Sequence, residues 1–220
     1  MSIVLPSKLT RWAFMFLVLR VAATRPPDVV IGEDSPEGPY LLRWYLTPWR
    51  RWLQTMPDGW LQWPARAGRL ALRLLPNLYL HKFMRDDDDR ANHDHPSFAL
   101  SWLLHTGYLE HTIDAGGIKH RRFHPPGSLR FMGLFHAHRI ELLRVAPNGV
   151  VRPVEAARWK ATTAENPLPT LDDPAVPCWS LFLFGPRLRE WGFHCPDRGW
   201  VHWEEFTKPG RPGEIGPGCD

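Results

Sequence analysis

The chain has 220 residues, of which 23 are proline and 12 are tryptophan, and its 27 lysines and arginines against 23 acidic residues give a net charge of +4. Proline breaks helix interiors and central strands, so this composition excludes a mostly helical bundle and favours short strands joined by turns. The basic residues are scattered, apart from Arg50-Arg51 and Arg121-Arg122, and they give no indication of a nucleic-acid partner.

The first element that we expect is a helix within an N-terminal extension over residues 1–39. Residues 12–23 are apolar, but a membrane span needs about 20 apolar residues, and Arg20 interrupts this shorter segment. Lys8 and Arg11 ahead of it give some likeness to a secretory signal peptide. We favour an amphipathic helix that packs on the domain, and we expect no membrane partner.

Residues 40–206 show short apolar segments separated by proline and glycine turns, a pattern typical of a β-sandwich or barrel. A helical insertion is expected over residues 49–76 and a long loop over residues 152–176. The tail over residues 207–220 is expected to be loose. The predicted strands are rich in aromatic residues or alternate apolar and polar side chains, and they cover residues 40–46, 78–83, 98–104, 108–113, 121–123, 129–131, 138–145, 179–184, 190–194 and 200–206.

The chain has three cysteines, Cys178, Cys195 and Cys219, and none of them forms a CxxC pair. An odd number without paired spacing makes a disulfide framework unexpected and favours a reducing, cytoplasmic location.

The histidines carry the clearest chemical pattern. His93-Asp94-His95 lies between two predicted strands, and residues two apart in an extended chain point to the same side. The two imidazoles can therefore converge on one ion while Asp94 faces away. His136 and His138 repeat the spacing after a turn. Imidazole suits Zn, Fe, Ni and Cu, so we predict a metal site of His93, His95 and His138; the alternative is a barrel without metal whose histidines only form hydrogen bonds.

This layout resembles the cupin superfamily, whose fold is a small double-stranded β-helix, or jelly-roll, barrel. His93 and His95 match the HxH of its first motif, and Gly107 matches the glycine that closes it. Gly127 matches the opening glycine of the second motif, and His138 falls at its histidine. The resemblance implies a mainly β, cupin-like barrel, and it suggests a homodimer because many cupins dimerise.

Two departures from the cupin pattern bear on the chemistry. The glutamate of the first motif falls near Ala99 or Leu100, and Gly133-Leu134-Phe135 replaces the PxG of the second. A three-histidine site without a carboxylate resembles the thiol dioxygenases and some ring-cleaving or diketone-cleaving cupins, which bind Fe(II). The stretches YLLRWYL, YLHKFMRDDDDRANHDHP, HAHRIEL and LFLFGPRLREWGFHCP look like those of uncharacterised cupin-like proteins of bacteria and phages, a likeness that supplies no reaction.

Other residues are candidates for supporting roles. Further metal ligands, or groups that orient the ligands, are His136, His81, Glu110 and Asp94. The acidic run over residues 86–89 is expected to be a solvated loop, or to supply one aspartate that orients a histidine. Arginines beside aromatic strands can hold a carboxylate or phosphate in a fork, or form structural ion pairs; they are Arg43, Arg187 and Arg189. Tryptophans that would line the pocket, or else form core, are Trp44, Trp102, Trp179 and Trp191.

The function that these residues favour is a non-heme Fe(II) dioxygenase-type oxidoreductase acting on a small anionic substrate, with Zn, Ni or Mn as other possible metals. One alternative is a non-catalytic cupin module that binds a small molecule or a protein. Another is a metal-assisted isomerase or hydrolase of sugar-like or nucleotide-like substrates. The sequence has no GxGxxG, Walker or GxSxG motif, the signatures of dinucleotide, nucleotide and serine-hydrolase sites.

Overall fold

The structure is a computed structural model that describes residues 2–33, 35, 37–49, 52, 71–72, 74–87, 91–113, 117–154, 169–208 and 216–219. Most of the insertion expected over residues 49–76, much of the loop expected over residues 152–176 and most of the tail over residues 207–220 lie outside the described residues.

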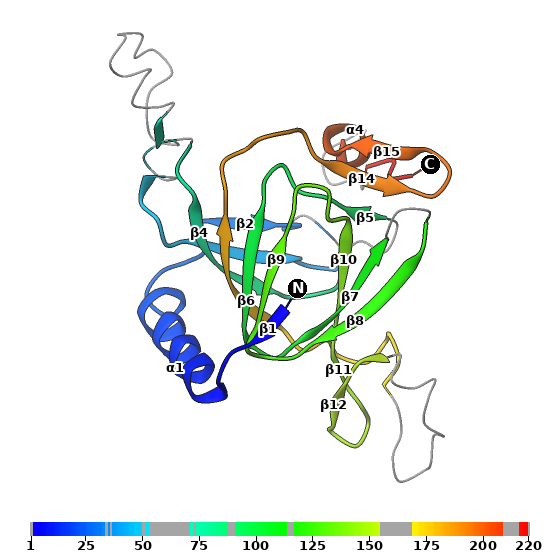
Figure 1. The fold of residues 1–220 in the computed structure, drawn as a ribbon. Coiled ribbons are helices and arrows are strands. Elements are labelled where there is room, and N and C mark those ends of the chain that lie inside the picture. Colours follow the sequence, from blue (N-terminus) through cyan, green and yellow to red (C-terminus); the bar gives the residue numbers. More distant parts are fainter. Residues whose placement is uncertain are drawn as a thin grey trace.

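Two antiparallel sheets face each other across the core of the described chain (Figure 1). The first has the order β1 (Ser2–Val4), β9 (Ser128–Met132), β6 (Ala99–His105), β13 (Cys178–Phe184), β4 (Asn77–Phe83), β3 (Leu41–Tyr45) and β2 (Val29–Ile31). The second has the order β15 (Gly199–His202), β14 (Gly192–Cys195), β5 (Asn92–His93), β10 (His138–Leu142), β7 (Tyr108–Ile113) and β8 (Lys119–His124). A small separate ribbon joins β11 (Arg144–Val145) and β12 (Val151–Arg152).

The order of the strands identifies the fold. Strands β4, β6, β9 and β13 are neighbours in the first sheet, whereas β5, β7, β8 and β10 are neighbours in the second. From β4 to β7 the chain changes sheet at every strand, and it does so again from β8 to β10 and on to β13. Eight strands arranged in this way form a jelly roll, the fold class of the cupins. The prediction of a mainly β, cupin-like barrel is confirmed.

The N-terminal helix covers the outer face of the first sheet. Helix α1 (Ser7–Leu17) continues into a π-helical segment, η1 (Val18–Ala22), so the helix begins earlier than the apolar segment of the sequence. Its buried Ala13 packs with Trp44, Leu80 and Leu104 of the sheet. The helix therefore covers the outer face over the central strands of this sheet, whereas Phe131 of β9 remains exposed.

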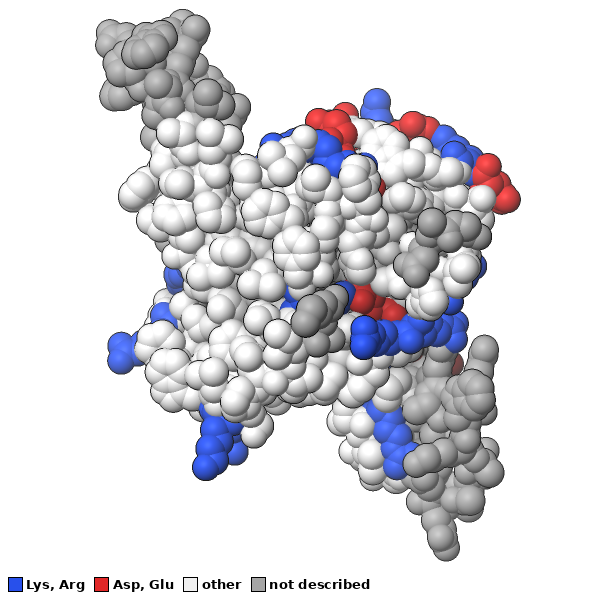
Figure 2. Space-filling view, viewed as in Figure 1, with Lys and Arg blue, Asp and Glu red and all other residues white. Residues whose placement is uncertain are grey.

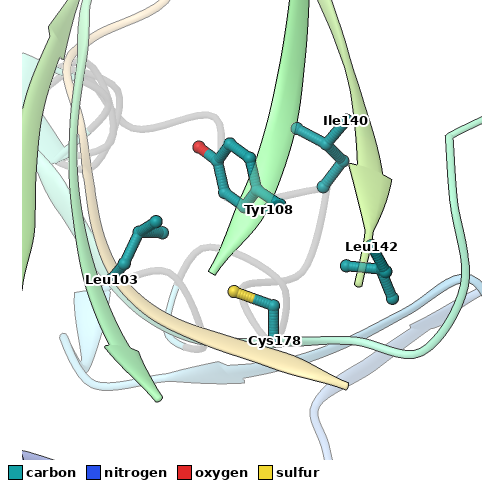
Figure 3. Packing of buried hydrophobic residues seen from close by; sticks show 5 residues of the cluster. All are labelled: Leu103, Tyr108, Ile140, Leu142 and Cys178. Atoms are coloured by element: carbon teal, nitrogen blue, oxygen red, sulfur yellow. The ribbon is translucent and has the colours of Figure 1, made fainter. Parts of the chain in front are cut away.

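Side chains from both sheets pack together in the core between them (Figure 3). Leu103, Tyr108, Ile140, Leu142 and Cys178 form this buried cluster. Burial raises the pKa of the Cys178 thiol to about 12, so this cysteine is a core residue rather than a nucleophile.

The cysteine prediction is wrong for the other two residues, because Cys195 and Cys219 form a disulfide. The disulfide joins Cys219 to the end of β14, and the neighbouring Gly218 backbone N–H donates to the carbonyl of Phe206 in α4 (Trp203–Thr207) at 3.1 Å. Phe206 is buried and its ring stacks on Phe193, with ring centroids 3.7 Å apart. The described part of the tail is thus fixed, and the cysteine argument for a reducing compartment does not hold.

Candidate metal centre

The structure brings His93, His95 and His138 together. Strands β5 and β10 are antiparallel neighbours with His93 opposite His138, and His95 follows on the same side two residues after His93. One ligand atom from each of the three histidines lies within 4.8 Å of the other two. The Nε2 atoms of His95 and His138 are 2.9 Å apart. Strand pairing, together with the alternation within the HxH segment, builds the cluster.

The donor set fits a metal ion. Two nitrogens each about 2.0–2.1 Å from one ion and at right angles to it would lie about 3 Å apart, close to the separation of the two Nε2 atoms. Burial and the nearby His138 and His93 hold the pKa of His95 well below its ordinary value. Burial also lowers the pKa of His138 to about 4. Both imidazoles are neutral at pH 7, the form that bonds to metals.

Glu110 fixes the orientation of His138. Strand β7 pairs with β10 and points Glu110 into the barrel, where its carboxylate accepts a hydrogen bond from His138 Nδ1 at 2.8 Å. The same carboxylate accepts from His136 Nε2 at 3.0 Å and from His124 Nε2 at 3.1 Å. A carboxylate on the far nitrogen of a ligand histidine sets its tautomer and aims the other nitrogen at the metal.

The Glu110 carboxylate is ionised although it is almost completely buried. Burial raises its pKa, but the hydrogen bonds from His124, His136 and His138 outweigh this effect, and the pKa lies far below the ordinary value. Arg130, also buried, forms an ion pair with the same carboxylate. Glu110, His136 and His138 are themselves close enough to hold an ion, so His136 and Glu110 lie where an additional ligand or an orienting group would be expected.

Asp94 faces away from the histidines and is only 1% exposed. It accepts hydrogen bonds from the Gly192 backbone N–H at 2.9 Å and from Trp200 Nε1 at 3.1 Å, and it pairs with Arg189 at 2.9 Å. It therefore ties β14 and β15 to β5. The structure does not bring Asp94 to the histidines, because the alternation that gathers them points it to the opposite side.

The described part of the acidic run is not a solvated loop. Asp86 accepts the Leu142 backbone N–H, and Asp87 accepts that of Ile140, both at 2.7 Å. The Asp87 carboxylate also lies 3.9 Å from His93 Nδ1. The run thus anchors the chain to β10 and places a negative charge beside a candidate ligand. Asp88 and Asp89 lie outside the described residues.

Arg43 and His81 form a polar pair inside the barrel, on neighbouring strands. The Arg43 Nε atom donates to His81 Nε2 at 2.9 Å, and the guanidinium lies 5.0 Å from the Tyr79 ring centroid. The His81 ring stacks on Phe182, with ring centroids 4.9 Å apart. Burial, followed by the charge of Arg43, lowers the pKa of His81. Arg43 also contributes to the lowered pKa of His95, so its charge acts at the histidine cluster.

The other two predicted anchoring arginines have structural roles. Arg187 is exposed and pairs with Glu190. Arg189 pairs with Asp94 and donates to the Leu134 carbonyl at 3.0 Å. The alternative interpretation of these two residues as ion-pair partners describes them better than substrate anchoring does.

Three of the four predicted pocket tryptophans lie elsewhere. Trp44, Trp102 and Trp179 belong to the cluster beneath α1, on the outer face of the sheet, so the structure does not bring them to the site and the alternative of core residues describes them better. Trp191 does lie near the site, with its ring centroid 6.4 Å from that of His93. Trp44 is buried and Trp102 and Trp179 are half-buried on this outer face, so apolar residues on both faces of the sheet left the two sides indistinguishable from the sequence.

Several groups that surround the cluster were not predicted from the sequence. Phe182 and Phe184 of β13 lie with ring centroids 6.3 and 6.1 Å from that of His95. Arg130 and His124, placed beside Glu110 by β9 and β8, were also missed. Residues alternate between the two faces of β13, so Phe182 and Phe184 share a face with Cys178 and not with Trp179. Knowing that Cys178 faces the core would have placed both phenylalanines inside the barrel.

The chain resembles known proteins in structure only, at low sequence identity. No family model matches the chain, and no curated protein matches it. A prolyl-4-hydroxylase of Pseudomonas putida is 14% identical, covering 85% of this chain and 91% of that one, with a TM-score of 0.42. Oxalate decarboxylase of Bacillus subtilis, a protein with Mn(II) centres, is 10% identical over 54% of this chain and 23% of that one, with a TM-score of 0.31.

An oxalate oxidase in complex with the substrate analogue glycolate is 10% identical over 54% of this chain and 45% of that one, with a TM-score of 0.33. The chain thus spans about a quarter of the length of the decarboxylase and less than half of the oxidase. At these scores the fold assignment rests on the order of the strands in the two sheets. Among the described residues, no helix is long and apolar enough to cross a membrane.

Proposed function

We propose that this chain is a metal-dependent enzyme in which His93, His95 and His138 hold one divalent metal, Fe(II), for a dioxygenase-type oxidation of a small anionic substrate. The observation that supports the proposal most strongly is the convergence of the three imidazoles of His93, His95 and His138. Imidazole ligands without a carboxylate bind Fe(II) as well as other transition metals. Bound Fe(II) would supply the activation of O₂ at its open coordination positions.

The surrounding residues would hold the metal and position the substrate. Glu110 keeps His138 oriented, with Nδ1 engaged and Nε2 directed toward His95. Arg43 supplies a positive charge inside the barrel, where a guanidinium can bind a substrate carboxylate through a charge-assisted fork. Phe182 and Phe184 provide apolar contact beside His95 and would exclude water from the reacting groups.

Metal analysis of the purified full chain tests the proposal. We expect about one iron per chain, and we expect its loss in a His93→Ala variant. His120→Ala is the matched control, because His120 is exposed on β8 and its replacement should leave the metal content unchanged. A chain without metal, with a stability unaffected by chelator, would refute the proposal, and zinc or nickel would favour the isomerase or hydrolase alternative.

Oxygen consumption by the iron-loaded chain then tests the reaction class. The substrates to screen are small carboxylates, with and without a thiol group, because Arg43 would select for an anionic group. We expect consumption with at least one of them, and a higher KM in an Arg43→Met variant that keeps its iron. Iron-loaded protein that consumes no oxygen with any substrate, but binds an anionic ligand, would favour the non-catalytic module.

A further inference from the structure

The outward face of the N-terminal helix is an apolar surface exposed to solvent. Its large apolar side chains are between 46% and 64% exposed, and they are Leu9, Trp12, Met15, Phe16 and Leu19. Trp12 and Phe16, one turn apart, stack with ring centroids 5.4 Å apart. Scattered exposed apolar residues are normal, but a continuous apolar patch marks an interaction site.

This face is fixed in place by the opposite side of the same helix. Thr10 and Ala13 are buried, and Phe14 and Leu17 pack against the cluster that includes Trp44. The exposed stripe is therefore preformed, and a partner would not have to order the helix on binding.

The charge around this stripe has one sign. Lys8, Arg11 and Arg20 are exposed on the same segment, and the sequence has no acidic residue before Asp28. Asp28 itself forms an ion pair with Arg25. The region around α1, at the lower left of Figure 2, correspondingly shows lysine and arginine atoms and no acidic atoms on the face in view.

We propose that the outer face of α1 and η1 docks on an anionic lipid bilayer, with the helix lying in the interface. Helices that bind in this way combine Trp, Phe and Leu on the apolar side with lysines and arginines that reach the headgroups. This proposal goes beyond the proposed oxidation and differs from the sequence expectation of no membrane partner.

The charge pattern favours a bilayer over the other occupants of such a face. A second copy of the chain would bring Lys8, Arg11 and Arg20 against the same three cations. A polyanion such as nucleic acid would neutralise the cations but would leave Trp12, Phe16 and the other apolar side chains in water. Only an anionic surface with an apolar interior matches both features.

Flotation of the full chain with lipid vesicles tests the proposal. We expect binding to vesicles of phosphatidylcholine with phosphatidylserine, weaker binding to phosphatidylcholine alone, and weaker binding at high salt. Each cation near an anionic surface contributes about a fivefold gain in affinity, so Arg11→Gln should lower affinity about fivefold. Leu19→Ser should weaken binding, and Ile118→Ser is its matched control because both side chains are 58% exposed.

Every variant removes an exposed side chain, so an unchanged thermal midpoint will show that each is folded. No vesicle binding would overturn the proposal, and so would equal binding to neutral and anionic vesicles or equal losses in Leu19→Ser and Ile118→Ser. A dimer in solution that Leu19→Ser dissociates, without any vesicle binding, would show that a second copy occupies the face. Metal content is independent of all these outcomes, so failure here leaves the proposed function standing.

Discussion

Replacing Glu110 by glutamine tests whether this carboxylate positions His138, while leaving the three proposed histidine ligands in place. The substitution keeps the size of the side chain but removes the negative charge that His124, His136 and His138 share. The side chain also loses its ionic attraction for Arg130, which is 4% exposed. We therefore expect both a less stable fold and a weaker metal site.

The magnitudes follow from the burial and the contacts. Breaking a buried ion pair by removing one partner costs about 3–5 kcal/mol, so the free energy of unfolding of Glu110→Gln should fall by about that much. Loss of a carboxylate behind a metal-binding histidine lowers metal affinity by about 10–100-fold. Urea denaturation measures the first effect, and calorimetric titration of metal-free protein with Mn(II) measures the second.

Glu141→Gln is the matched control for this prediction. Glu141 is also buried and accepts a hydrogen bond from His111 Nε2 at 2.9 Å. It belongs to neither of the two groups that could hold a metal ion, His93–His95–His138 and Glu110–His136–His138. It should lose stability and keep its metal affinity. If Glu110→Gln binds Mn(II) as tightly as the unmodified chain does, the assignment of Glu110 as the group that positions His138 is refuted.

Three further results are expected. Reducing the disulfide, or replacing Cys219 by serine, should cost about 3 kcal/mol in urea denaturation, because it releases a loop with a sequence separation of 24 residues; equal midpoints with and without reductant would contradict this. In the folded, metal-free chain the pKa of His138 is about 4, below the ordinary value of about 6.5. The unfolded chain therefore binds this proton at higher pH than the folded chain does, so the free energy of unfolding should fall as pH drops from about 6.5 to about 4. A stability profile that is flat over this range, or unchanged in His138→Asn, would count against this assignment. Trp44→Ala should lower the free energy of unfolding by about 3–5 kcal/mol, as for other buried aromatic residues, and should keep its full metal content. Loss of metal from a folded Trp44→Ala variant would instead show that Trp44 contributes to the metal site.

The histidine cluster could be predicted because it depends on local geometry. Alternation along an extended segment places His93 and His95 on one side and Asp94 on the other, whatever the rest of the chain does. The pairing with His138 followed from the spacing of two motifs and from the resemblance to the cupins. Close turns and alternating segments predicted a β-sandwich or barrel, whereas the prediction of a jelly roll came from the resemblance to the cupins.

The surroundings of the cluster depend on contacts between distant segments. Glu110 reaches His138 only because β7 and β10 pair with Ile140 opposite Glu110, and no local pattern sets that register. Trp44, Trp102 and Trp179 could not be assigned to a face of the sheet from the sequence. The outer face packs against α1 and therefore carries apolar side chains, as the interior does. The disulfide was missed because the chain returns from α4 to β14 through contacts around Phe206.

The most direct test of the central claim is an anomalous diffraction map of crystals grown with Fe(II) or Mn(II). We expect one strong peak bonded to His93, His95 and His138, with His95 Nε2 and His138 Nε2 each at about 2.1 Å, as imidazole nitrogens bind metals. A peak held instead by Glu110 and His136, or no peak among the three histidines at saturating metal, would contradict the account.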